Sequence, residues 1–481
     1  MKKLILLVLS YFIFLFIYSS SVLALPNNIF GIHITHEADL DKAVELVNSS
    51  GGDWGYITIV IQDKDMDHKK WQTFFDKCRD KHLIPLVRLA THSEGENWTK
   101  PSTDLINQYS NFLNSLNWPV KNRYIIVFNE PNHTKEWGGQ ANPKEYAQIL
   151  NQAITVFKQK NQDFYMLNAG LDQAAPNSKT TMDEAKFLRE MNFEIPLIFE
   201  RLDGWSSHSY PNHGFIGKPW ETGKASVAGY KWELSYLKTL GNHKELPVFI
   251  TETGWPHGLM VNARLPGTLS AGNVGQGKWE MGGFYKPEIT AEYIKYAFEN
   301  IWFKDNNIVA VTPFIINYPQ EPFDHFSWIN VSGEKYPQFD LVANFPKNRG
   351  IPEQIEKIEM GNFFYPPFLP SGIIYQGKIT LVNKGQDIWG EKPFIVKANT
   401  NPNLEVSDLV LPENVLVKPG EKYDFNYSIN TNDLSGDYEF NWDGFDTNKI
   451  KIFQVWKFTN QSKSKTFLEE IIARISSIFT K

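Results

Sequence analysis

The sequence has very little cysteine: Cys78 is the only one among 481 residues. A single thiol cannot form an intrachain disulfide, and it cannot supply the several cysteines of a zinc site. The chain also lacks a His-Glu-x-x-His motif, and no Gly-x-Gly-x-x-Gly follows its first predicted strand. We therefore expect neither a metal site nor a bound cofactor.

Positive charge is scarce as well, with 48 Lys and Arg against 54 Asp and Glu and a net charge of -6. Nucleic acid is not an expected partner, because phosphate binding depends on clustered basic residues. An apolar content of 42% excludes a mainly disordered chain, and the length exceeds what one hydrophobic core usually serves. We expect two domains in a monomeric protein.

The first residues are typical of an export signal. Lys2 and Lys3 precede an apolar run over residues 4–18, and a small-residue cleavage point follows Ala24. The alternative is an uncleaved anchor, because residues 4–25 approach the length that spans a bilayer. In both cases residues 1–24 predict an extracellular or cell-surface protein, and a retained segment would attach it to the membrane.

Short β-rich runs alternate with amphipathic helical patterns between residues 27 and 345. Eight strands are predicted, at residues 30–34, 56–61, 85–89, 124–128, 164–169, 202–207, 248–251 and 309–316. Eight such repeats in this length match an α/β fold of the (β/α)8 TIM barrel type, whereas an open doubly wound sheet usually has fewer strands.

Two of these apolar strands end in a glutamate. Residues 124–128 are followed by Asn129, Glu130 and Pro131, and residues 246–250 are followed by Thr251 and Glu252. Parallel strands present such side chains at their C-terminal ends, where α/β proteins place their active sites. A pair of carboxylic acids is the minimum requirement for glycoside hydrolysis. Either motif alone is more often a polar turn, so the joint placement carries the hypothesis.

With the strands numbered, the chain resembles the clan A retaining glycoside hydrolases over the whole predicted barrel. In that clan an Asn-Glu pair closes strand four and supplies the acid/base, and a Glu closing strand seven is the nucleophile. The resemblance implies these roles for Glu130 and Glu252, a 2-hydroxyl contact for Asn129, and a β-linked glycan as substrate.

The same resemblance extends to three further positions, Arg88 at the end of strand three and His208 and Tyr210 after strand six. It implies that Arg88 and Tyr210 orient or hydrogen-bond the nucleophile. The alternative is a purely structural role for Arg88 and His208: Arg88 would form an ordinary ion pair of the barrel, and His208 would be a hydrogen-bonded structural histidine. Strand eight departs from the clan, because many members place a tryptophan platform there. Tyr318 or Trp328 would have to replace it.

The two acids need different surroundings, because retention requires an ionised nucleophile beside an acid that keeps its proton. We expect Arg88 to keep Glu252 ionised. A spacing of about 5 Å between the carboxyl groups would predict retention, and a gap of about 7 Å or more would predict inversion.

Other substrate contacts are predicted from aromatic residues and loops on the same face. Trp255, Trp137 and Trp220 are candidate stacking surfaces for sugar rings, and His33 is a candidate rim contact or a packing residue. The loop over residues 256–288 is long enough to be a substrate lid.

The pattern changes after the barrel. Residues 346–364 read as a linker, and residues 365–456 contain short alternating strands typical of a β-sandwich. Those strands are expected at residues 373–382, 394–398, 406–411, 423–429, 438–442 and 450–456. With Trp389 and Trp442, this part resembles the tryptophan-bearing immunoglobulin-like domain of autophagy cargo receptors. The tail over residues 457–481 is polar and ends in a short amphipathic helical pattern.

We interpret the chain as an exported retaining glycosidase that cleaves a β-linked poly- or oligosaccharide by double displacement. The alternative is a non-catalytic cell-surface polysaccharide-binding protein on a degenerate barrel. Turnover distinguishes these two interpretations.

Overall fold

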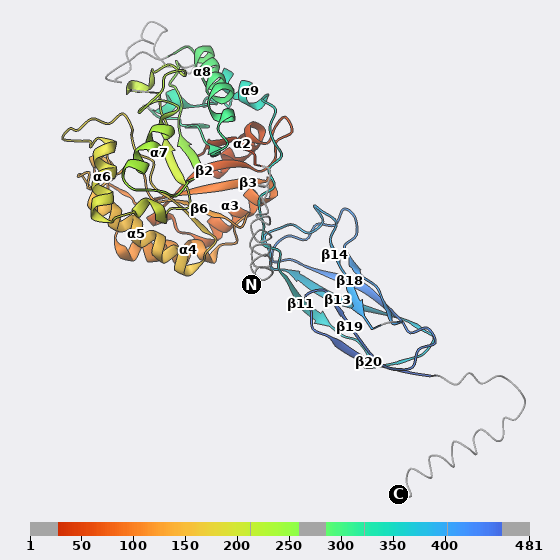
Figure 1. Cartoon of the computed structure of the whole chain (residues 1–481). Coiled ribbons are helices and arrows are strands. Elements are labelled where there is room, and N and C mark those ends of the chain that lie inside the picture. The colour runs from red at the N-terminus through yellow and green to blue at the C-terminus, as the bar shows by residue number, and fades with distance from the viewer. Residues whose placement is uncertain (1–26, 212, 259–284, 322, 402, 455–481) are drawn as a thin grey trace, which may run out of the picture. The chain divides into compact units, whose positions relative to one another are not determined.

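Two units make up the chain in the computed structural model, residues 1–355 and residues 356–481 (Figure 1). The structure describes residues 27–211, 213–258, 285–321, 323–401 and 403–454. The predicted signal or anchor, most of the predicted lid and the C-terminal tail lie outside these ranges. Within them, no helix is both long and apolar enough to cross a membrane.

The N-terminal unit is built around eight parallel strands. They are β1 Gly31–His33, β2 Gly55–Gln62, β3 Leu83–Ala90, β6 Arg123–Ile126, β7 Phe164–Leu167, β8 Trp205–His208, β9 Val248–Glu252 and β10 Ile308–Val311. The strands pair in the orders β1-β2-β3-β6-β7 and β10-β9-β8. Two isolated parallel bridges, Phe30 to Val311 and Leu167 to Gly204, join the edges of these two sheets. Pairing therefore runs around all eight strands, which we call the closed sheet.

Helices follow the strands and cover the outside of the closed sheet (Figure 1). They are α2 Leu40–Val47, α3 His68–Asp80, α4 Thr103–Ser115, α5 Pro143–Lys160, α6 Glu184–Glu194, α7 Gly229–Thr239, α8 Pro287–Asn300 and α9 Pro337–Ala343. Four of them begin at a side chain that accepts a backbone N–H of the first turn, namely Asp67, Ser102, Asn142 and Asp183. Such caps satisfy N–H groups that have no partner within the helix. The predicted alternation of parallel strands and helices is confirmed.

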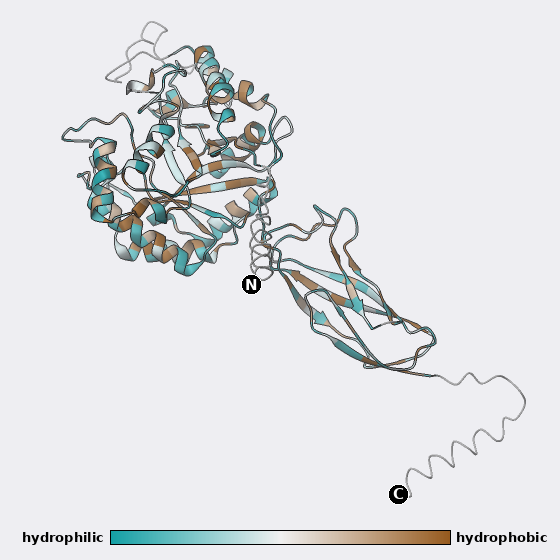
Figure 2. Cartoon of the chain, viewed as in Figure 1, coloured by the Kyte–Doolittle hydropathy of each residue, from teal (hydrophilic) through white to brown (hydrophobic). Residues whose placement is uncertain are grey.

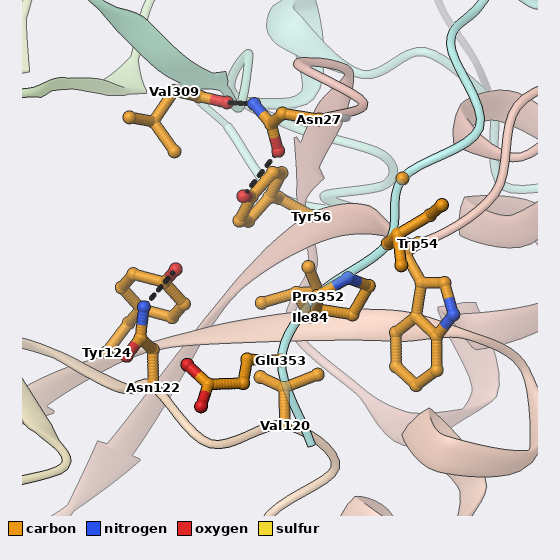
Figure 3. Close-up of a pocket in the computed structure, with 12 residues that line it drawn as sticks. Asn27, Trp54, Tyr56, Ile84, Val120, Asn122, Tyr124, Val309, Pro352 and Glu353 are labelled. Carbon is orange, nitrogen blue, oxygen red and sulfur yellow. Dashed lines mark hydrogen bonds between the residues drawn. The ribbon is translucent and has the colours of Figure 1, made fainter. Parts of the chain in front are cut away.

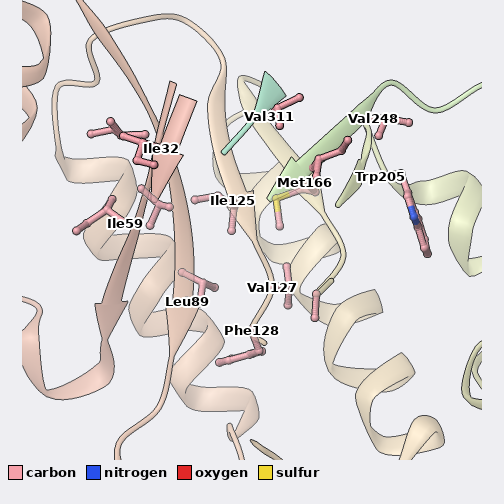
Figure 4. Close-up of a cluster of buried hydrophobic side chains, with 14 of the residues drawn as sticks. Ile32, Ile59, Leu89, Ile125, Val127, Phe128, Met166, Trp205, Val248 and Val311 are labelled. Atoms are coloured by element: carbon pink, nitrogen blue, oxygen red, sulfur yellow. The ribbon is translucent and has the colours of Figure 1, made fainter. Parts of the chain in front are cut away.

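A large hydrophobic core lies between the strands and the helices (Figure 4). Ile57, Ile59 and Ile61 of β2 point into it, because every second residue of a strand faces the same side. Figure 2 shows the result as brown residues along β2 and β3, against mixed brown and teal helices.

The side chains on the inner side of the closed sheet change from apolar to polar along the strands. Near the N-terminal ends it is apolar, with Ile84 and Leu86 of β3 among its buried residues. Further along it becomes polar, as Thr58 and Thr312 share a hydrogen bond of 2.8 Å. Arg88 follows Ile84 and Leu86 at the same spacing of two, so its side chain projects inward at the C-terminal end.

A cavity of about 260 Å³ opens at the N-terminal ends of the strands (Figure 3). Tyr56 and Tyr124 line it, and the Tyr56 hydroxyl donates to Asn27 Oδ1 at 2.8 Å. Both tyrosines are near the start of their strands, whereas Glu252 is the last residue of β9. This cavity therefore lies at the end opposite to the two glutamates.

The C-terminal unit contains two four-stranded sheets, β11-β13-β18-β16 and β12-β20-β19-β15. Their strands are β11 Ile358–Phe363, β12 Phe368–Pro370, β13 Ile374–Asn383, β15 Ala398–Thr400, β16 Glu405–Val406, β18 Lys422–Asn430, β19 Gly436–Trp442 and β20 Asn448–Phe453. The pairs are antiparallel except for β12 with β20. One buried cluster contains residues of both sheets, including Tyr427 and Trp442 at 5.1 Å between ring centroids. The two sheets therefore pack on each other.

Two predicted boundaries need correction. The expected linker is divided between the units: Glu353 O accepts from Lys121 N at 2.8 Å, whereas residues 358–363 form β11. The single strand expected at residues 406–411 is replaced by the short strands β16 and β17 Leu409–Val410, which pair with different partners. Sequence alternation did not show this change of partner.

Candidate active site

Glu130 lies in a bent segment directly after β6. Phe128 has φ 72° and Glu130 has φ 31°, both in the left-handed region that residues with side chains rarely adopt. Each such residue costs about 1–3 kcal/mol, so surrounding contacts must hold the bend. One of these contacts is Glu130 N to Gly170 O at 3.1 Å.

Glu252 ends β9 and is 8% exposed. Arg88 Nη1 donates to its Oε1 at 2.5 Å, and the Tyr210 hydroxyl donates to its Oε2 at 3.2 Å. Burial alone would raise the pKa of Glu252, but the positive charges of His208 and Arg88 outweigh it and lower that pKa. The ionised carboxylate is therefore favoured, as a nucleophile requires.

His208, the last residue of β8, lies between the two glutamates. Its Nδ1 is 2.9 Å from Glu130 Oε1 and 3.8 Å from Glu252 Oε2. Burial would lower the pKa of His208, but the charges of Glu252 and Glu130 outweigh it and raise that pKa. A Cβ at Gly170 would come within 2.1 Å of His208 Cδ2, so the ring fits only beside a glycine.

The two acids therefore meet in one site. One oxygen of Glu130, one oxygen of Glu252 and one nitrogen of His208 all lie within 4.8 Å of one another. That spacing could also suit a metal ion, since three such side chains offer one ligand atom each. However, the Arg88 guanidinium already places a positive charge against Glu252, which disfavours a second cation there.

Asn129 lies between Arg88 and a further acid, Glu136. Its Oδ1 accepts from Arg88 Nη1 at 2.7 Å, while its Nδ2 donates to Glu136 Oε2 at 3.4 Å. Sequence reasoning missed Glu136. Burial and the charge of Glu130 raise the pKa of Glu136, which makes it a third acid near the site. Its only sequence signal was its position six residues after Glu130.

His33 lies beside Glu252 with 3.9 Å between Nε2 and Oε1. It is 2% exposed, and burial together with the charge of Arg88 lowers its pKa to about 3. The ring is neutral near pH 7 and packs edge to face with Phe314, at 5.2 Å between centroids. This placement favours the packing interpretation of His33 over a charged contact.

The prediction that three tryptophan rings stack on sugars is wrong for two of them, because those two rings are buried. Trp137 is 1% exposed and Trp255 is 2% exposed. Their indole N–H groups donate to Glu145 Oε2 and Gly217 O, at 2.9 Å and 2.8 Å. A buried indole with a satisfied N–H offers no face to a sugar. The sequence could not show that these rings point into the protein.

Trp220 is 56% exposed, but it stands against α8. Its ring packs edge to face on Tyr293 and Tyr296, at 6.0 Å and 5.8 Å between centroids. It lines a groove of about 530 Å³ together with residues of α7 and α8, such as Trp232. The structure does not place it beside the two glutamates.

We expect Trp137→Ala to destabilise the protein and Trp220→Ala to change neither its stability nor its substrate binding appreciably. Loss of the buried Trp137 ring should lower the free energy of unfolding by about 3–5 kcal/mol. Loss of Trp220 should change it by less than about 1 kcal/mol and leave the KM for a monosaccharide glycoside unaltered. Urea unfolding measures the free energy of unfolding of each variant, and steady-state kinetics measures its KM. A raised KM in Trp220→Ala with unchanged stability would show that Trp220 does form a sugar subsite.

Of the two residues expected to replace the strand-eight tryptophan, only Tyr318 keeps part of its surface exposed. Trp328 is 2% exposed and has no free face for a sugar. Tyr318 is half-buried, and its backbone N–H donates to Ser327 Oγ at 3.0 Å. Phe314, three residues after β10, is half-buried and touches His33. Phe314 was missed because only a tryptophan, or a later aromatic residue, was sought.

No family model matches the chain, and no curated protein matches its sequence. Solved structures do resemble it. A GH39 enzyme from Xanthomonas axonopodis pv. citri is 15% identical with a TM-score of 0.42, over 66% of this chain and 65% of that chain. A monomeric beta-xylosidase from Caulobacter crescentus CB15 is 12% identical with a TM-score of 0.45, over 84% and 97%. A beta-mannanase from Thermomonospora fusca is 12% identical with a TM-score of 0.40, over 66% and 89%. These values do not assign the chain to a family.

Proposed function

We propose that this protein is a retaining glycoside hydrolase in which Glu252 is the nucleophile and Glu130 is the acid/base. The observation that carries the proposal is the approach of the two side chains, because one oxygen of Glu130 lies within 4.8 Å of one oxygen of Glu252. Retaining enzymes have the short spacing, because the nucleophile touches the sugar itself. Inverting enzymes need a wider gap that admits a water molecule.

In the first step Glu252 attacks the anomeric carbon as the glycosidic bond breaks. Glu130 gives its proton to the leaving oxygen, so the departing sugar leaves as a neutral alcohol. Arg88 and Tyr210 hold the attacking carboxylate in place through their hydrogen bonds to opposite oxygens. The product of this step is a covalent ester between Glu252 and the sugar.

In the second step water cleaves that ester. Glu130, now ionised, takes a proton from the water while the oxygen of the water bonds to the anomeric carbon, and Glu252 leaves as a carboxylate. The configuration is inverted twice and therefore retained. His208 faces Glu130 throughout and supports its negative charge in this step.

The substrate we propose is a β-linked poly- or oligosaccharide, on the resemblance of the Asn129 and Glu130 pair to clan A enzymes. Asn129 would contact the sugar 2-hydroxyl, and Phe314 would provide the apolar platform after strand eight. We further propose that the protein acts outside the cell, on the strength of residues 1–24. The C-terminal unit is proposed as an immunoglobulin-like module without catalytic residues.

The test is a screen of aryl β-glycosides and cell-wall glycans with the wild type, Glu130→Gln and Glu252→Gln. We expect hydrolysis by the wild type, strong losses in both variants and no effect of EDTA. Binding of glycans without any hydrolysis would instead favour a polysaccharide-binding protein. Loss of activity in EDTA would favour a metal at Glu130, His208 and Glu252.

Arg88→Met is expected to move the acidic limb of the kcat/KM profile to higher pH. Arg88 lowers the pKa of Glu252, so its removal raises that pKa, and the nucleophile becomes ionised only at higher pH. A neighbouring positive charge favours the ionised form of a carboxyl group, so the acidic limb should move measurably when that charge is removed. Arg88→Lys is the control that keeps the charge. An unmoved acidic limb in Arg88→Met would contradict this role.

A further inference from the structure

Behind β8 lies a second pair of glutamates that the proposed reaction does not use. Glu184 begins α6 and Glu233 belongs to α7, and both are 0% exposed. Both oxygens of Glu184 and Oε1 of Glu233 make no hydrogen bond of ordinary geometry within the described ranges, although the Trp205 indole N–H lies near enough to act as a donor to Glu233. The fourth oxygen, Glu233 Oε2, accepts from the Ser207 hydroxyl. The two carboxyl groups are within hydrogen-bonding reach of each other.

The charged groups nearest to this pair are already engaged elsewhere. Lys224 pairs with Asp183. Asp172 pairs with His133 at 2.8 Å, and His208 pairs with Glu130 at 2.9 Å. Two adjacent buried carboxylates without a cation of their own repel strongly and lose their hydration. One of the two must therefore hold a proton.

We propose that Glu184 and Glu233 share one proton in a hydrogen bond between a carboxylic acid and a carboxylate, and that this bond positions the segment bearing His208 and Tyr210. Burial and the facing negative charge raise the pKa of Glu184, and burial raises that of Glu233. Near neutral pH the pair then carries a single negative charge, which accepts the Ser207 hydrogen bond.

The link to the active site runs through two serines that flank His208. Ser207 Oγ lies 2.8 Å from Ser209 Oγ, and Gln173 Nε2 donates to Ser207 Oγ at 3.1 Å. The backbone N–H of Tyr230 donates to Ser209 Oγ at 3.1 Å. The buried pair thus fixes both neighbours of His208, and we regard Glu184 and Glu233 as positioning residues. This role rests on the proposed function, whereas the shared proton does not.

The pH dependence follows from the raised pKa values. An unfolded glutamate releases its proton at about pH 4.3, while the folded pair keeps one to higher pH. The stability that the shared proton contributes is complete below that unfolded pKa and is lost as the pH rises through the folded pKa. Above it, two buried charges repel and loosen the segment that bears His208.

The test is the thermal stability of the full chain as a function of pH. In Glu184→Gln an amide N–H donates to Glu233 at every pH, in place of the shared proton. We expect the Tm of this variant, relative to wild type, to rise progressively as the pH is raised above the unfolded glutamate value of about 4.3. Glu233→Gln should behave similarly, because its amide keeps an acceptor for Ser207. Glu190→Gln, also on α6, is the matched control and should show no such trend.

A second measurement tests the positioning role. We expect the alkaline limb of the kcat/KM profile to move to higher pH in Glu184→Gln, a change that a purely structural glutamate would not produce. A Tm difference that stays constant or falls with pH would overturn the shared proton. So would stabilisation of the wild type by Ca²⁺ or Mg²⁺ that EDTA reverses. The expected Tm trend in a protein without hydrolysis would refute only the proposed function.

Discussion

Glu252→Gln is expected to lower kcat/KM by about 10⁴-fold or more on every substrate the wild type hydrolyses. The amide cannot form the covalent ester, so no improvement of the leaving group compensates for the change. The measurement is steady-state kinetics with aryl β-glycosides whose phenols differ in acidity. We expect an equally large loss across that series.

The isosteric change keeps the site otherwise intact. The carbonyl oxygen of the introduced amide would still accept a hydrogen bond, and the amide has the shape of the carboxyl group, so the Tm should remain close to that of the wild type. Glu245→Gln, at a side chain that is 78% exposed, is the matched control and should retain full activity. Residual activity above about one tenth of wild type in a folded Glu252→Gln protein would contradict the nucleophile assignment.

Glu130→Ala should produce a loss that depends on the leaving group. Departure of a sugar alcohol needs a proton, and general acid catalysis contributes about 10²- to 10⁴-fold, so kcat/KM on glycans should fall by that amount. An acidic phenol leaves without a proton, so its kcat/KM should fall far less. The second step still lacks its base, so we expect a burst of phenol followed by slow turnover.

A Glu136→Gln variant is the most informative comparison with Glu130→Ala, because it tests whether Glu136 is the proton donor instead. Glu136 is the third acid near the site, and its raised pKa would suit a proton donor as well. Glu136→Gln should lower activity on glycans and on aryl glycosides by similar factors, because its contact is with Asn129. If the dependence on leaving group appeared in Glu136→Gln instead, Glu136 would be the acid.

Much of the fold could be predicted because strand and helix patterns are local. Residues 85–89 were expected as a strand, and β3 covers Leu83–Ala90. The alternation of Ile84, Leu86 and Arg88 toward one side follows from the strand period of two. His208 and Glu252 end their strands and Arg88 lies two residues before the end of β3, so the parallel arrangement alone brings them together.

The parts that the sequence did not reveal depend on contacts between distant segments. Whether an indole is buried is decided by its neighbours, so Trp137 and Trp255 could not be distinguished from exposed rings. The left-handed backbone at Glu130 needs the carbonyl of Gly170, which is 40 positions away in the chain. Likewise, Glu184 and Glu233 face each other only because α6 and α7 flank β8.

The most direct test of the central claim is mass spectrometry after incubation with 2-deoxy-2-fluoro aryl β-glycosides of the common pyranoses. The fluorine slows both steps, and the good leaving group lets the first step proceed, so the covalent ester accumulates. The account predicts one fluoroglycosyl group on Glu252, and none on Glu252→Gln. A label on another residue, or rapid hydrolysis to a product of inverted configuration without any label, would contradict it.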